Sequence, residues 1–438
     1  MIRSRFGRVA ITTMSAVSIL TATLLGSASA GTVVHPTVVS ADPANFTPNL
    51  LADSSVAHPA AYALESANGT MYVGGQFAQV QNAARTTTYD RSNFMAFDTT
   101  TGTVSAAVAP SFNGAVWAIR ASGTSLYVGG TFTAVDGVAR QGLVKLNAAT
   151  GAVDPSFQPP WTTGGVTDLQ VVGGRLIAGG TFPKALLALD LTTGANTGFL
   201  NVGVAGTCQN NAACGQGANT GTSGRSNVYR FAVDSTGTRL VAIGNFVAPH
   251  PRAFMVDLTT GALTPWYYRN LAHECRASSV YPAYLRDVDF APDGSYFVIA
   301  STGYIPTDGS RIGLDVCDAA ARFETDINDP ALPTWINYTG GDTLHSVVVT
   351  GAAVYVNGHN RWLDNPYGAD TCLTTCVSRP GIGAINPTTG QALAWNPTKD
   401  RGVGGKDLLA TSQGLWVASD TKKIGGEYHY GLALMPLS

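Results

Sequence analysis

Leu126-Tyr-Val-Gly-Gly130 is an apolar run that ends in two glycines, and it recurs along the chain. Two close copies are Met71-Tyr-Val-Gly-Gly75 and Leu176-Ile-Ala-Gly-Gly180. Fainter copies are Leu240-Val-Ala-Ile-Gly244, Tyr296-Phe-Val-Ile-Ala300, Val354-Tyr-Val-Asn357 and Leu415-Trp-Val-Ala418. The first small residue of each copy falls at position 74, 129, 179, 244, 300, 357 or 418, a spacing of 50–65 residues. Seven similar units predict a repeat architecture.

Each unit has the same internal order, which the second one illustrates. The apolar stretch 116–120 precedes a Ser122-Gly123 turn, the glycine-ended strand follows, and a further apolar stretch at 142–146 ends in a Thr-Gly turn. That turn recurs as Asp98…Thr101-Gly102, Asn147…Thr150-Gly151, Asp190…Thr193-Gly194, Asp257…Thr260-Gly261 and Asn386…Thr389-Gly390. Asp or Asn can cap such a turn, and glycine adopts the positive φ that closes it. A fourth segment often carries an aromatic residue, as at Phe157, Trp266, Trp335 and Trp395. Four short antiparallel strands form one blade of a β-propeller.

The two ends of the chain complement each other. The last unit stops at 432–437, after its third strand, whereas Ala44-Asn-Phe-Thr-Pro-Asn-Leu50 resembles the fourth-strand phrases Asp154-Pro-Ser-Phe-Gln158 and Ala394-Trp-Asn-Pro397. We therefore predict an all-β fold, a seven-bladed β-propeller of four-stranded antiparallel blades. An N-terminal strand completes the last blade and removes an open sheet edge.

The repeats resemble a known group. Tyr127-Val-Gly-Gly-Thr-Phe132, the Thr-Gly turn after it and Pro155-Ser-Phe157 are similar to the delta-sixty repeats of secreted bacterial propellers. This resemblance covers about residues 45–438 and implies a propeller fold and export, but no settled activity and so no catalytic residue. One phrase, Ala384-Ile-Asn-Pro-Thr-Thr-Gly-Gln-Ala-Leu-Ala-Trp395, is similar to quinoprotein-type propeller repeats, which also occur in non-enzymes.

Composition and charge limit the class of protein. Of the 438 residues, 45% are hydrophobic, only 12% are charged and 50 are glycine, which suits short strands and tight turns. Arg3, Arg5 and Arg8, the apolar stretch 9–25 and Ala28-Ser-Ala30 indicate an export signal at 1–30, with a membrane anchor as the alternative. Without that segment, 23 Lys plus Arg face 28 Asp plus Glu, and a net charge of −5 argues against nucleic acid as a partner. We predict a secreted, extracellular monomer with a linker at 31–43, one domain at 44–438 and no membrane span.

The six cysteines predict disulfides. Cys208 and Cys214 enclose five residues, Cys372 and Cys376 enclose three, and Cys275 and Cys317 lie in two connections that should be neighbours. Neither close pair has the C-x-x-C spacing of a zinc site, and no His stands at ligand spacing beside one. We therefore predict no metal site, and no cofactor.

Long insertions mark the functional face. They fall at 76–92, 201–227, 268–283, 302–317, 359–380 and 420–430, all in connections on one face of the predicted propeller. Loops on a rigid frame commonly carry function, although neutral drift also lengthens surface loops. The candidate ligand-binding residues in the last two insertions are His359, Arg361, Trp362, Asp364, Tyr367, Tyr428 and His429. Aromatic rings beside Asp, Asn and Arg suit sugars, but Trp362 and Tyr367 could equally pack the loop onto its blade.

A second set of candidates lies at the mouth of the central channel, where the first strands begin. These residues are Trp117, Asp168, Arg230, Arg286, Asp287, His345, Lys406 and Asp407. The three Asp could supply a carboxylate pair for acid–base chemistry. The alternative is ion pairing across the mouth, for instance of Arg230 or Arg286 with Asp287.

These features together predict an extracellular, non-catalytic scaffold that binds a glycan or a protein through its long-loop face. The alternative is a secreted hydrolase or lyase that acts on polysaccharide through the channel-mouth carboxylates. The sequence contains no nucleophile motif or phosphate loop, so no catalytic residue is assigned.

Overall fold

The computed structural model describes residues 33–208, 226–275, 285–305, 308–367, 370–372 and 375–437. Over these residues the protein is all-β, with many small antiparallel sheets and one 3-10 turn, η1 (Arg269–Ala272). None of the described segments is a helix that could cross a membrane. The predicted export signal at 1–30 lies outside the described residues.

Seven of the sheets share one meander, in which an inner strand is followed by a second and a third antiparallel strand. The first sheet contains β2 (Ala60–Ala67), β3 (Thr70–Gln76) and β6 (Phe94–Asp98), and the second contains β7 (Val116–Ser122), β8 (Ser125–Gly130) and β11 (Leu143–Asn147). The third contains β12 (Val166–Val172), β13 (Arg175–Gly180) and β14 (Leu186–Asp190), and the fourth contains β15 (Asn227–Val233), β16 (Arg239–Asn245), β17 (Ala253–Asp257) and β18 (Ala262–Leu263). The fifth sheet contains β19 (Leu285–Phe290), β20 (Tyr296–Ser301), β21 (Ala319–Glu324) and β22 (Trp335–Tyr338). The sixth contains β23 (Leu344–Val349), β24 (Val354–Gly358) and β27 (Ile382–Ile385), and the seventh contains β28 (Gly405–Thr411), β29 (Gly414–Ser419) and β32 (Leu432–Pro436).

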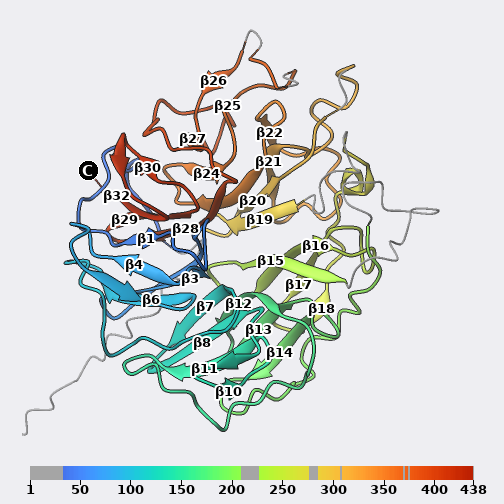
Figure 1. The fold of residues 1–438 in the computed structure, drawn as a ribbon. Helices are drawn as coiled ribbons and strands as arrows, with labels where there is room; N and C mark the ends of the chain where they lie inside the picture. Colours follow the sequence, from blue (N-terminus) through green and yellow to red (C-terminus); the bar gives the residue numbers. More distant parts are fainter. Residues whose placement is uncertain are drawn as a thin grey trace, which may run out of the picture.

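The seven sheets follow one another around a common centre in chain order (Figure 1). Each inner strand contacts the inner strand of the next sheet, and β28 of the last sheet contacts β2 of the first. The core lies between successive sheets, because their buried apolar side chains form shared clusters. In one of these clusters Phe94 of the first sheet packs with Val116 and Ile119 of the second.

The paired glycines allow this close approach. A Cβ atom on Gly129 would lie 2.5 Å from Cγ1 of Val166 in the next sheet, and one on Gly130 would lie 2.1 Å from the carbonyl oxygen of Ala115. Real side chains do not tolerate such distances, so these positions need glycine for packing.

The predicted Thr-Gly turns are confirmed. Oδ1 of Asp98 accepts hydrogen bonds from the main-chain N–H groups of Thr100 and Thr101 at 3.0 and 2.8 Å, and Gly102 has φ +70°. Asn147 bonds its own turn in the same way at 2.9 and 3.1 Å.

The fourth segment of each unit is less regular than predicted. Within the described residues, only the sheets that end in β18 and β22 have a fourth strand in their own meander. In four others this segment makes one bridge to the third strand: Phe97–Val104, Leu146–Val153, Leu189–Asn196 and Ile385–Ala392. The chain turns soon after Val153 because Pro155 has no N–H to donate and Asp154 accepts a bond from the N–H of Ser156 at 2.9 Å.

Small hairpins occupy several connections between second and third strands. They are β4 (Gln79–Gln81) with β5 (Thr88–Asp90), β9 (Ala134–Val135) with β10 (Val138–Ala139), β25 (Trp362–Leu363) with β26 (Val377–Ser378), and β30 (Lys423–Ile424) with β31 (Glu427–Tyr428). The segments that connect successive sheets pair with these hairpins, since Phe112 bridges Val135 and Lys399 bridges Ile424. These hairpins and connections therefore lie at the same ends of the strands.

Residues 33–51 join the last sheet to the first. The main-chain N–H groups of Ala44 and Leu50 each donate to a carbonyl on the outer side of the last sheet, Leu434 and Tyr430, at 2.8 Å. The segment is not a regular strand there, and β1 (Asn49–Leu51) instead pairs with β4. The predicted linker at 31–43 includes Val39, which is 3% exposed and belongs to the core beside the last two sheets.

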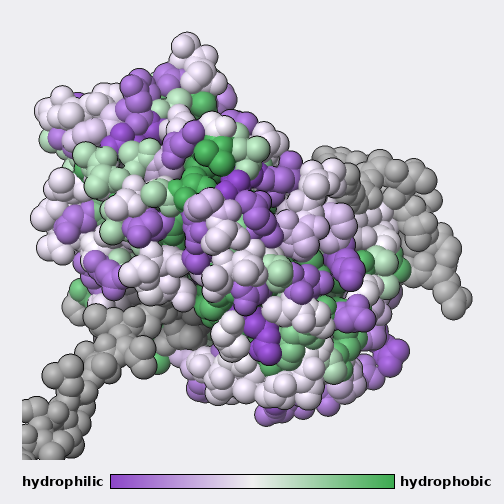
Figure 2. Space-filling view, turned by 90° about the horizontal axis from the view of Figure 1, so that it is seen from below, coloured by the Kyte–Doolittle hydropathy of each residue, from purple (hydrophilic) through white to green (hydrophobic). Residues whose placement is uncertain are grey.

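The surface combines hydrophilic and hydrophobic residues, as the edge view in Figure 2 shows. The large apolar side chains that are exposed in the described part of the chain are Val34, Val138, Leu263, Ile327, Leu332, Tyr367 and Val403. They belong to several different segments, so they do not by themselves mark a docking surface.

Two of the predicted disulfides lie in the described residues. Cys275 pairs with Cys317, with Cα atoms 5.8 Å apart, and Cys372 pairs with Cys376. Cys208 is also disulfide-bonded, and its predicted partner Cys214 lies outside the described residues.

Loss of the Cys275–Cys317 disulfide should lower the free energy of unfolding by up to about 4 kcal/mol, because the bond closes a long loop. The sequence separation is 42 residues, against 4 for Cys372–Cys376, whose removal should cost about 2 kcal/mol at most. Urea unfolding of Cys275→Ala/Cys317→Ala, beside Cys372→Ala/Cys376→Ala as the matched control, measures the difference. Equal losses in both variants would contradict the loop-length argument.

Candidate functional site

Every inner strand contains a β-bulge at the same place near its start. In each strand, one residue between two paired residues has no partner on the second strand. The seven unpaired residues are Tyr62, Trp117, Thr167, Tyr229, Arg286, His345 and Lys406. A bulge redirects a side chain and increases the local twist. Seven repeated bulges therefore present seven side chains at equivalent positions near the centre of the molecule.

Six of these seven residues line a pocket of about 400 Å³. Its remaining walls come from Thr131, Gly165, Thr181, Asn227, Arg230 and Leu285. The seventh bulge residue, Tyr62, stacks on Trp117 with ring centroids 4.2 Å apart and planes 9° apart. The pocket opens among the loops that carry the hairpins, because Thr131 and Thr181 begin connections between second and third strands.

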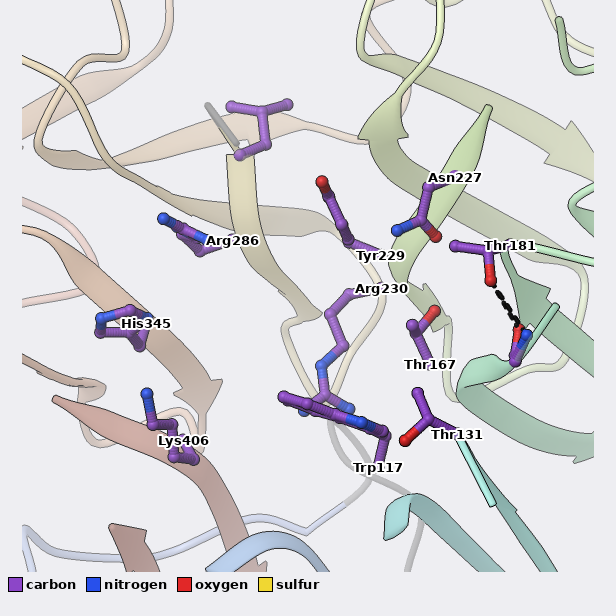
Figure 3. A pocket seen from close by; sticks show the side chains of 12 residues that line it. Trp117, Thr131, Thr167, Thr181, Asn227, Tyr229, Arg230, Arg286, His345 and Lys406 are labelled. Atoms are coloured by element: carbon purple, nitrogen blue, oxygen red, sulfur yellow. Dashed lines mark hydrogen bonds between the residues drawn. The ribbon is translucent and has the colours of Figure 1, made fainter. Parts of the chain in front are cut away.

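The pocket has two chemically different sides (Figure 3). Arg286, His345 and Lys406 lie together on one side. The opposite side carries the neutral polar residues Thr131, Thr167, Thr181 and Asn227, and Arg230 and Trp117 lie between the two sides. Such a pocket can hold a ligand that is charged at one end and carries hydroxyl groups at the other.

Two buried polar atoms in the pocket walls lack a hydrogen-bond partner among the described residues. They are Nε of Arg286 and Oδ1 of Asn227, whose residue is 8% exposed. An unsatisfied buried polar atom is costly, and sites that bind polar ligands are one place where such atoms occur.

His345 is uncharged at neutral pH. Burial, together with the positive charges of Lys406 and Arg286, holds its pKa well below the usual value. Its Nε2 donates to the carbonyl of Val403 at 3.1 Å, which leaves Nδ1 as an acceptor in the neutral ring.

The three predicted carboxylates lie behind the pocket wall and link neighbouring sheets. Oδ2 of Asp168 accepts a hydrogen bond from the main-chain N–H of Phe231. In the same way, Oδ2 of Asp287 accepts from the N–H of Val347 and Oδ2 of Asp407 from the N–H of Leu64, each at 2.8 Å. In each case Oδ1 accepts the N–H of the following residue, at 2.8–3.0 Å. Both oxygens of each carboxylate are thus used by the main chain.

Arg230 balances these acids. Its Nη1 lies 3.8 Å from Oδ1 of Asp168, and its charge lowers the pKa of Asp287 and Asp407 against the larger effect of burial. Burial still raises the pKa of Asp287 to about 7. The main-chain bonds to both oxygens argue against a carboxylate pair open to a substrate. Among the described residues, Asp168 is the one of the three that makes ion pairs, with Arg230 and Arg120 at 3.8 Å each, whereas Asp287 lies within ion-pair distance of neither Arg230 nor Arg286.

Most of the ligand-binding candidates predicted in the 359–380 insertion bond to residues of the surrounding loops. Arg361 pairs with Asp342 at 2.9 Å and its guanidinium lies 4.4 Å from the ring centroid of Trp362. His359 Nδ1 donates to the carbonyl of Gly402 at 2.6 Å, and Asp364 accepts the N–H of Ala392 at 3.0 Å. Tyr367, in contrast, is 63% exposed.

Tyr428 and His429 lie beside the N-terminal segment and the first hairpin instead of the pocket. His429 is buried and its Nδ1 is 3.0 Å from Oγ1 of Thr47. The guanidinium of Arg85 lies 4.5 Å from the ring centroid of Tyr428. Neither residue is among those that line the pocket.

Several pocket residues were absent from the predicted set: Thr131, Gly165, Thr167, Thr181, Asn227, Tyr229 and Leu285. Thr131 and Thr181 each follow a Gly-Gly pair directly, so their equivalent position in the repeat could identify them as candidates for the pocket. No group of three or more His, Cys, Asp or Glu that could hold a metal ion occurs in the described part of the chain.

The chain matches no protein-family model and no curated protein. Among solved structures it is similar to the computationally designed Ika8 protein, with 10% identity over 89% of this chain and 98% of that chain and a TM-score of 0.46.

Proposed function

We propose that this protein is a secreted, seven-bladed β-propeller that binds an extracellular glycan in the pocket at the centre of its long-loop face. The succession of inner strands from β2 to β28 and back to β2 supports the ring of blades. The bonds from residues 44–50 to the last sheet support closure by the N-terminal segment. The disulfides are compatible with an extracellular location.

The observation that carries the binding function is the composition of the pocket. Trp117 and Tyr229 offer aromatic surface, while Thr131, Thr167, Thr181 and Asn227 offer neutral hydrogen-bonding groups in about 400 Å³. A sugar presents the matching surfaces, since its C–H faces pack on rings and its hydroxyls bond polar groups.

A non-catalytic role is preferred to the enzymatic alternative. An acid–base catalyst must reach the proton that it transfers. Asp168, Asp287 and Asp407 bond the main chain with both oxygens and are absent from the pocket lining.

Trp117→Ala should weaken glycan binding by at least about tenfold, because a stacked aromatic anchor is lost from the pocket. Binding of the chain 31–438 to an array of cell-wall and plant oligosaccharides, followed by calorimetry on the best ligand, measures this. Trp362→Ala is the matched control, since this tryptophan lies outside the pocket lining, and it should bind like the wild type. Circular dichroism checks that both variants fold.

The opposite pattern, in which Trp362→Ala alone loses binding, would place the site on the outer loop. Binding of proteins but no glycan would contradict the ligand class. Release of sugar fragments that Asp287→Asn abolishes would support the enzymatic alternative instead.

A further inference from the structure

We propose that the sugar held in this pocket is negatively charged, and that Arg286 and Lys406 bind its anionic group. This inference rests on the glycan-binding function proposed above and names the ligand class for the same site.

The first argument is that neither of these two cations has a counter-ion in the part of the chain that the structure describes. Neither the guanidinium of Arg286 nor the ammonium of Lys406 makes an ion pair or a hydrogen bond within the described residues, although both are half-buried in the pocket wall. Two half-buried arginines elsewhere in the chain do have carboxylate partners, since Arg230 lies 3.8 Å from Asp168 and Arg401 lies 2.8 Å from Asp342. Two unpaired cations in a concave site are expected where a ligand supplies the negative charge.

The nearest acids do not fill this role. Asp318 interacts with Arg286 only beyond ion-pair distance, and burial raises the pKa of Asp318 well above its usual value, which favours its uncharged form. Asp420 also lies beyond ion-pair distance of Lys406. Its carboxylate accepts hydrogen bonds from the N–H groups of Val403 and Gly404 at 3.0 and 3.2 Å. Within the described ranges, the positive charge of this side of the pocket is therefore uncompensated.

The second argument is the pattern of neutral groups around the cations. His345 lies with Arg286 and Lys406 on this side (Figure 3), and its Nδ1 can accept a hydrogen bond from a ligand hydroxyl. Across the pocket, the unpartnered Oδ1 of Asn227 is a second acceptor for a hydroxyl. A group that bears both an anion and hydroxyls fits this arrangement, whereas a bare inorganic anion offers no donor to His345 or Asn227.

The test compares three probes of matched size by calorimetry: a uronic-acid oligosaccharide, a sulfated oligosaccharide and the neutral parent. The wild-type protein should bind at least one acidic probe about 10- to 100-fold more tightly than the neutral one, as expected for charge-assisted hydrogen bonds. The two acidic probes distinguish a carboxylate from a sulfate as the recognised group. Binding of the acidic probe should weaken as salt is raised, and binding of the neutral probe should not.

Arg286→Met and Lys406→Met should each remove most of the preference for the acidic probe, measured as the ratio of the affinities for the acidic and the neutral probe. Lys423→Met, an exposed lysine on the β30 hairpin, is the matched control and should keep the preference. Lys406→Arg keeps the charge and should also retain it, which tests the idea even if a methionine variant fails to fold.

Three outcomes are distinct. Equal binding of neutral and acidic probes would overturn this inference and leave the glycan-binding function standing. Absence of binding to every sugar would overturn both. An acidic preference that survives both methionine substitutions would overturn the assignment to Arg286 and Lys406.

Discussion

Deletion of residues 33–51 should lower the free energy of unfolding by about 3–6 kcal/mol and cause the protein to associate. The segment buries Val39 and Leu50, which are 3% and 0% exposed, and complete burial of such side chains contributes about 1.5–3 kcal/mol each. It also covers the outer side of the last sheet through the bonds of Ser40, Ala44 and Leu50. An uncovered strand edge is a template for pairing with another chain.

The deletion is measured by urea unfolding and by size-exclusion chromatography, with a chain that begins at Val33 as the control. The control should unfold cooperatively and elute as one species. A chain that begins at Ala52 and has the same unfolding midpoint as the control would show that the N-terminal segment is not part of the folded unit.

Arg230→Met should cost about 3–5 kcal/mol at pH 8, because it removes the positive charge that acts on Asp287 and one of the two, with Arg120, that act on Asp168 and Asp407. Arg230 acts on Asp168, Asp287 and Asp407 together, and replacement by a side chain of similar length removes the charge with little change in volume. This loss should be smaller at pH 5 by at least about 1 kcal/mol.

The sign of this pH effect follows from the raised pKa of Asp287, which is about 7 in the folded protein. In the unfolded chain the pKa of an Asp is about 4. At pH values between that pKa and the folded-state pKa of Asp287, the native state therefore binds more protons than the unfolded state. The free energy of unfolding therefore falls as pH rises through this window. Without Arg230 the pKa of Asp287 rises further, so the fall is steeper in the variant than in the wild type.

Urea unfolding of wild type and variant at pH 5 and pH 8 measures both effects, with Arg230→Lys as the charge-preserving control. An identical loss at the two pH values would contradict the account of Arg230 as the balancing charge for the buried acids.

Much of the local structure could be read from the sequence because it depends on neighbours in the chain. The turn at Asp98–Gly102 forms from its own side-chain oxygen and its own glycine, so its motif alone predicts it. The Cys275–Cys317 disulfide was also predictable, since the repeat places both connections at the same ends of adjacent units. The predicted fourth strand is too long in this unit, because Asp154 and Pro155 end the pairing soon after Val153.

The sequence pattern does not predict which residues at the start of the inner strands line the pocket and which bond to a neighbouring sheet. Trp117, Arg286, His345 and Lys406 were predicted at the centre and line the pocket, but Asp287 and Asp407, one position further along, bond to the neighbouring sheets. The difference depends on the bulge at each strand start, which inserts a residue that has no partner. No residue type signals this bulge, because Tyr, Trp, Thr, Arg, His and Lys all occupy it.

Repeat number, turn positions and the pairing of Cys275 with Cys317 thus follow from the order of residues, because short-range hydrogen bonds and spacing control them. The division of the central charges into a paired set around Arg230 and an unpaired set at Arg286 and Lys406 does not. It arises only when strands from separate repeats meet, since a side chain's partner there belongs to a different sheet and is set by the register between strands.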